Sequence, residues 1–124
     1  MSDLVTQNVE GQIDISPLAI ARLASHAVLQ SYGIVGMAAP NLASGIAWTL
    51  TRDPNRGIEV RIDSEQVFID LYIIIEYGTR ISTVASSVIN AVRFYVEKAT
   101  GLAVMQIHVH VQGVHVSEDP KVNN

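Results

Sequence analysis

A long alternating stretch at residues 67–77, VFIDLYIIIEY, dominates the hydrophobic pattern of the chain. Alternate side chains of a β-strand share one face of the sheet, so its odd-numbered positions form a continuous apolar face. These positions are Val67, Ile69, Leu71, Ile73, Ile75 and Tyr77. The even-numbered positions are mixed: Phe68, Asp70, Tyr72, Ile74 and Glu76. We therefore predict a long strand with one buried face, and what covers the other face is the functional question.

Two helices are predicted from apolar periodicity and capping residues. Ser16 and Pro17 favour a helix start, and that helix extends to about Ser31, with Gly33 as a left-handed cap. Residues 80–99 follow the i, i+3, i+4, i+7 pattern throughout and end before Gly101. Thr79 is the expected N-cap of this second helix. Its roughly 30 Å length matches the apolar face of residues 67–77.

Three further strands complete the predicted fold. Residues 12–15 suit a short edge strand, and residues 58–63 form a hairpin with 67–77 through the turn 64–66. The last strand covers 102–116, with apolar residues at its odd positions from Met105, until Gly113 shifts the phase as a bulge would. The predicted class is α+β, a two-layer sandwich with a mixed sheet. Its element order is β-α-β-β-α-β, with both helices on one face.

Two irregular segments allow other interpretations. Within 38–56, Asn41 could cap a short helix, although Gly45 would weaken it. The Gly-x-x-Gly at Gly33–Gly36 is similar to the loop with which KH domains clamp nucleic acid. Its middle residues are apolar rather than basic, which favours a buried turn after the helix.

Composition narrows the class of protein. At 124 residues we expect one domain at 10–116 with flexible tails at 1–9 and 117–124. A net charge of −4 disfavours nucleic acid, and the absence of cysteine excludes thiol chemistry. No signal peptide is evident and no apolar run approaches the ~20 residues of a membrane helix, so we expect a cytoplasmic protein without direct membrane insertion. With 48% hydrophobic and only 16% charged residues, the surface favours self-association.

Candidate chemistry is limited to two histidines. His108 and His110 are two apart on a predicted strand and share the face opposite the helices, where Asp70, Glu76, Glu59 or Asp63 could join them, depending on strand order. Imidazole with carboxylate suits a metal site or acid–base catalysis. A solvated sheet face is the simpler explanation, because no third ligand stands at a fixed spacing. His26 and His115 look isolated. With no nucleophile elbow and no phosphate-binding glycine motif, we predict no enzyme, no cofactor and no metal.

The same outer face is the candidate interaction surface. Semi-apolar sheet faces more often bind proteins than catalyse reactions. The surface predicted here comprises Phe68, Tyr72, Ile74, His108 and His110. The alternative is that a tail or residues 38–56 cover it.

Several of these stretches resemble the bacterial alkaline-shock protein family, the Gls-type general stress proteins of Gram-positive bacteria. The similar segments are residues 11–16 (GQIDIS), 32–37 (YGIVGM), 56–60 (RGIEV), 69–74 (IDLYII), 77–81 (YGTRI), 100–102 (TGL) and 109–114 (VHVQGV). They cover nearly all of 10–116 in order, and the chain is most similar to short stand-alone members.

The resemblance implies a cytoplasmic, non-enzymatic protein of stress response or cell-envelope homeostasis. It also implies self-association, a membrane-anchored partner, or a kinase-like partner that ties the chain to lipid metabolism. No family site residues carry over. A KH-like nucleic-acid-binding module and a metal-dependent enzyme using His108 and His110 are the alternative functions.

Overall fold

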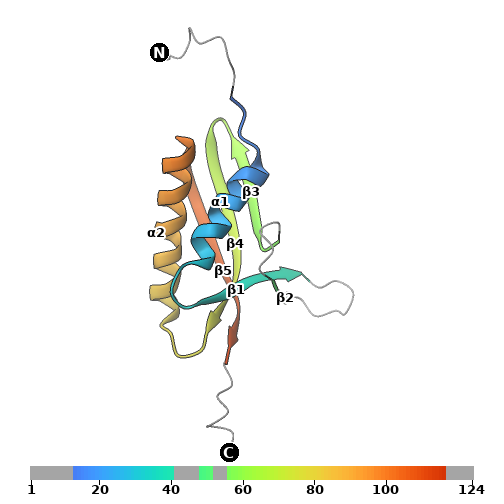
Figure 1. Cartoon of the computed structure of the whole chain (residues 1–124), viewed down its shortest axis with the longest axis vertical. Coiled ribbons are helices and arrows are strands. Elements are labelled where there is room, and N and C mark those ends of the chain that lie inside the picture. The colour runs from blue at the N-terminus through green and yellow to red at the C-terminus, as the bar shows by residue number, and fades with distance from the viewer. Residues whose placement is uncertain (1–12, 41–47, 52–55, 117–124) are drawn as a thin grey trace, which may run out of the picture.

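The computed structural model describes residues 13–40, 48–51 and 56–116 (Figure 1). These residues form α1 (Pro17–Leu29), β1 (Ile34–Pro40), β2 (Trp48–Thr51), β3 (Ile58–Asp63), β4 (Gln66–Glu76), α2 (Ile81–Thr100) and β5 (Ala103–His115). The predicted tails at 1–9 and 117–124, and the part of the predicted short helix at 41–47, lie outside the described residues.

The central strand of the sheet is β4. Along one edge it pairs in parallel with β5 over its whole length. Along the other edge it pairs antiparallel with β3 through residues 66–71 and then with β1 through residues 73–75, and β1 continues into an antiparallel pair with β2. The predicted α+β class, with two helices and a mixed sheet, is confirmed.

The hydrophobic core lies between this sheet and the two helices, which cover one face side by side (Figure 1). The odd-numbered residues of β4 from Val67 to Ile75 are at most 1% exposed, as predicted, whereas Tyr77 is 68% exposed and lies beyond the strand end. Helix α2 contributes four valines on one stripe: Val84, Val88, Val92 and Val96. Helix α1 contributes Ile20, Val28 and small alanines that bring it close to the sheet. Burying each large apolar side chain stabilises the fold by about 1.5–3 kcal/mol.

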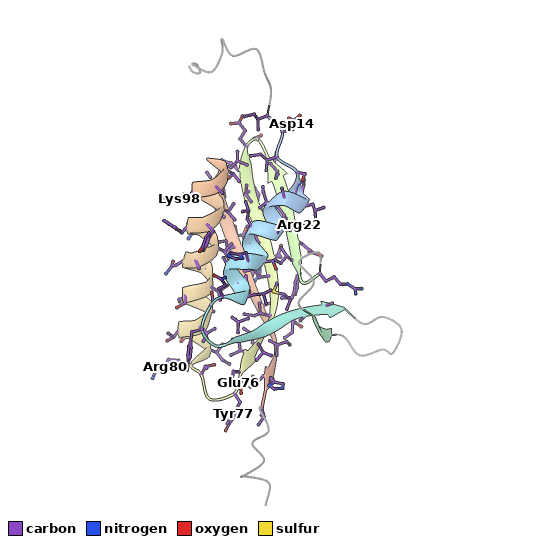
Figure 2. The ribbon with its side chains drawn as sticks, viewed as in Figure 1. Asp14, Arg22, Glu76, Tyr77, Arg80 and Lys98 are labelled. Carbon is purple, nitrogen blue, oxygen red and sulfur yellow. The ribbon has the colours of Figure 1, made fainter. Side chains whose placement is uncertain are left out.

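The predicted ends of the helices are partly right. Ser16 Oγ accepts a hydrogen bond from Ala19 N–H at 3.1 Å, and Gly101 ends α2 with a left-handed φ of 78°. Thr79 does not cap α2, because its hydroxyl donates to Glu76 O at 2.7 Å instead. The N-cap is Arg80, which makes no side-chain capping bond (Figure 2). Gly33 has a φ of +89°, but it lies in the turn beyond Gln30, the C-cap of α1.

Two strands were not predicted, and one predicted strand is missing. Residues 13–15 are not part of a strand, so the expected edge strand is wrong over the described part. Residues 34–40 and 48–51 form β1 and β2 instead of a turn and a helix. The consecutive residues Met37, Ala38 and Ala39 are all buried, and a strand buried on both faces shows no period-two pattern.

Strand β5 contains two register shifts against β4. The one between Ile73 and Ile74 leaves Gln112 without a partner before Gly113, which confirms the predicted bulge. The other leaves Met105 unpaired and 51% exposed, so its predicted core orientation is wrong and Val104 is buried in its place. An extra residue reverses the alternation of faces, which explains both phase changes.

Candidate functional site

The outer face of the sheet carries the even-numbered side chains of β4, while both helices pack on the other face. All of the side chains from Phe68 to Glu76 on this outer face are half-buried, so neighbouring strands shield them only in part. This face contains every candidate residue predicted from the sequence: Phe68, Tyr72, Ile74, His108 and His110.

The strand register places polar side chains of β5 and β3 beside the even-numbered residues of β4. On β5, His108 lies opposite Asp70 and His110 opposite Tyr72. On the β3 edge, Glu59 is the cross-strand partner of Asp70. Because these residues come from three adjacent strands, their grouping depends on the pairing of the sheet and not on local sequence.

Asp70, His108 and His110 form a compact cluster. Asp70 Oδ1 lies 3.0 Å from His110 Nε2 and 3.7 Å from His108 Nδ1. The first distance is a hydrogen bond, whereas the second is too long for one. The two imidazole rings lie 4.1 Å apart, and one ligand atom from each of the three side chains falls within a 4.8 Å span. These three side chains could hold a metal ion.

Tyr72 contacts the cluster through His110. Its ring stacks on His110 at 4.3 Å between centroids with an interplanar angle of 8°, and its hydroxyl donates a hydrogen bond to the Glu59 carboxylate. Burial raises the pKa of the Tyr72 phenol, and the negative charges of Glu59 and Asp70 raise this pKa further. The phenol therefore stays protonated and keeps donating at neutral pH.

Along β4, the stretch of this face from Asp70 to Tyr72 lies between two apolar side chains. At one end Phe68 lies under the Arg61 guanidinium, 4.3 Å from the ring centroid. At the other end Ile74 packs over Gly113, where an added Cβ would lie 3.2 Å from Ile74 Cδ1. The absence of a side chain at Gly113 leaves Ile74 room on the outer face.

The remaining carboxylates and histidines are distributed differently. Asp63 lies at the hairpin end next to Ser64 and does not join the histidines. Glu76 instead pairs with His115 at 3.4 Å, so His115 is not isolated, and His26 makes an edge contact with Tyr95. Of the four carboxylates considered from the sequence, Asp70 alone contacts both candidate histidines within the described residues.

The structure also bears on the membrane and KH-like possibilities. Over the described residues, neither helix is long and apolar enough to cross a membrane. Residues 34–36 belong to β1 and pair with β4 at Ile75 and Ile74, so the Gly-x-x-Gly segment is not a loop between two helices. A KH-type clamp would require such a loop.

The fold and site together define a small two-layer α+β domain whose outer sheet face presents aromatic, aliphatic and imidazole side chains. Residues 5–116 match the model of the alkaline-shock ASP23 family, whose description is a cell envelope-related function. The chain belongs to this family, as the resemblance implied.

Relatives in two bacteria extend over most of the chain. The uncharacterised protein YloU of Bacillus subtilis is 46% identical over 109 residues, covering 86% of this chain and 91% of YloU. The uncharacterised protein Spy1614 of Streptococcus pyogenes is 28% identical, covering 86% of this chain and 90% of its own. Two solved structures, both zinc forms of MamM CTD, are 13% identical with TM-scores of 0.45 and 0.46. They cover 86% and 82% of this chain, and 88% and 87% of their own.

Proposed function

We propose that this chain is a non-enzymatic interaction module of cell-envelope homeostasis that self-associates through the outer face of its sheet. One observation carries the proposal. The row of Phe68, Tyr72 and Ile74 stays half-exposed on a face that neither helix covers. The occupant we propose is a second copy of the chain, because the low charged fraction of 16% leaves little to keep copies apart.

The make-up of this face supports an interface more than a catalytic floor. Tyr72 and His110 stack at its centre, and Phe68 and Ile74 add apolar surface on either side along β4, which suits a protein interface. The His–Asp cluster lies on an open surface, with the His108 side chain 58% exposed, whereas catalytic groups work best where water is excluded.

The family resemblance supplies the proposed biological setting. We place the chain in the cytoplasm, with a membrane-anchored or kinase-like protein as a second partner and a link to lipid metabolism through it. A pull-down from the native host, with the wild-type chain as bait and Tyr72→Asp as the matched control, tests this part. A partner captured only by the wild type supports it.

Light scattering after size exclusion tests self-association. We expect the wild type to be larger than a monomer and Tyr72→Asp to be monomeric, because a carboxylate at the centre of a desolvated interface is costly. The matched control is Tyr95→Asp, on α2 in the helical layer, where it lines a groove of about 620 Å³ with α1. Tyr95 is 41% exposed, so its substitution adds the same charge to the opposite side of the molecule.

The two variants separate the possible interfaces. A wild type that stays monomeric at high concentration would refute the proposal. Dissociation by Tyr95→Asp, with Tyr72→Asp still associated, would move the interface to the helices and refute the sheet-face assignment.

A further inference from the structure

We propose that Asp70, His108 and His110 bind one borderline divalent transition-metal ion, with Zn²⁺ as the test ion. The sequence alone predicted no metal, because two histidines lacked a third ligand. The structure supplies this ligand from the neighbouring strand. This inference is independent of the proposed self-association, since one chain provides all three side chains.

The separations of the ligand atoms fit the ion. Zn²⁺ binds histidine nitrogen and carboxylate oxygen at about 2.0–2.2 Å, so adjacent ligands of a tetrahedral site lie about 3.3–3.5 Å apart. The two distances from Asp70 Oδ1, 3.0 and 3.7 Å, bracket this spacing. These two distances therefore need to change by only a few tenths of an ångström, and the two histidine nitrogens already lie within 4.8 Å of each other.

A hydrogen-bond network alone explains the cluster less well. His110 Nε2 donates to Asp70 Oδ1 at 3.0 Å in the absence of metal. His108 Nδ1 lies 3.7 Å from the same oxygen, beyond hydrogen-bonding distance. Two imidazole nitrogens thus converge on one carboxylate oxygen while only one of them bonds to it. A cation bound by Asp70 Oδ1 and by one nitrogen of each histidine would give all three atoms a bonding partner.

The surrounding residues orient the ligands. The parallel β4–β5 register holds Asp70 directly opposite His108. The Tyr72 ring stacks on His110 and fixes the plane of its imidazole, and Glu59 holds the Tyr72 hydroxyl. Such support around metal ligands commonly changes affinity by about 10–100-fold. Glu59 also adds negative charge near the ion.

The ligand set determines the class of ion. Two imidazoles and one carboxylate suit Zn²⁺ and its neighbours better than Mg²⁺ or Ca²⁺, which prefer oxygen ligands. Exposed fractions of 58% for the His108 side chain and 41% for Asp70 leave the remaining coordination position open to water.

Isothermal titration of Zn²⁺ into the untagged full-length chain, freed of metal by chelation, tests the proposal. We expect one ion per chain, and we expect Asp70→Asn and His108→Gln each to weaken binding by about 100-fold or more, since they remove ligands themselves. His115→Gln is the matched control: this histidine is also at the strand surface beside a carboxylate, but its pair with Glu76 offers two ligands and not three. It should leave affinity within about threefold.

Co²⁺ absorption provides the second readout. A tetrahedral Co²⁺ spectrum in the wild type and in His115→Gln, lost in Asp70→Asn, supports the site. Circular dichroism verifies that each variant is folded. Absence of stoichiometric Zn²⁺ binding by the wild type would overturn the proposal. Equal loss of binding in all three variants, or no loss in Asp70→Asn, would overturn it as well.

Discussion

At the residue scale, Gly57 lets the backbone just before β3 pass close to Met37 and Ala38 of β1. Its φ is +82°, and an added Cβ would lie 2.8 Å from Met37 Cβ and 3.1 Å from Ala38 O. Its carbonyl accepts a hydrogen bond from Tyr72 N–H at 2.8 Å, directly beside the outer-face cluster. The position therefore demands a residue without a side chain for two reasons, backbone conformation and space.

Gly57→Ala should lower the free energy of unfolding by about 2–4 kcal/mol, because left-handed strain and overpacking add. Gly78→Ala is the control: its φ is +95°, but nothing lies within 4 Å of the added Cβ. This variant should lose only the strain part, about 1–2 kcal/mol. Urea unfolding measures both. Equal losses would mean that the close approach at Gly57 has no energetic cost.

At the element scale, the sequence predicts best where a single face is buried. Helix α2 and strand β4 follow their apolar periods to within a residue or two, since each has one clear core side. Strand β1 has buried residues on both faces, so its sequence shows no alternation of apolar and polar positions. For this reason the sequence did not predict it. Period-based prediction fails there for a physical reason.

The candidate site was predictable only in part. That His108 and His110 share a face follows from their spacing of two. That Asp70 joins them depends on the β4–β5 register, which two irregularities shift, one on each side of the cluster. The bulge at Met105 changes the pairing of β4 with β5, and the sequence has no obvious signal for it. Asp70 could therefore be considered as a third ligand, but it could not be chosen over the other three carboxylates from the sequence.

The N-terminus of α2 offers a gain in stability. Its N-cap Arg80 makes no side-chain capping hydrogen bond, and no acidic residue occupies the first turn. A cation is unfavourable at this end of the helix dipole. Arg80→Ser should raise the free energy of unfolding by about 0.5–2 kcal/mol through a new cap. Arg80→Ala removes the charge without capping, so it should gain less. Thermal unfolding compares them, and equal gains would assign the whole effect to charge.

At the scale of the whole molecule, β4 joins the fold to the proposed function. One face of this strand holds the core beneath both helices, and the other presents Phe68, Tyr72 and Ile74. Adjacent residues on the strand therefore serve different purposes. This arrangement makes stability and association separable by substitution at neighbouring positions.

Ile73 and Ile74 test this separation with the same chemical change. Ile73 is 0% exposed, so Ile73→Ala should lower the free energy of unfolding by about 2–5 kcal/mol at any protein concentration. Ile74 is half-buried on the outer face, so Ile74→Ala should cost the monomer less.

The concentration dependence of the urea midpoint is the deciding measurement. Association stabilises the folded state by mass action, so the wild-type midpoint should rise with concentration. Ile73→Ala should keep this rise at a lower midpoint, because its outer face is unchanged, whereas Ile74→Ala should flatten it. If Ile74→Ala instead destabilised dilute protein as much as Ile73→Ala, another part of the same chain would be covering the outer face. A second copy could then not be its occupant.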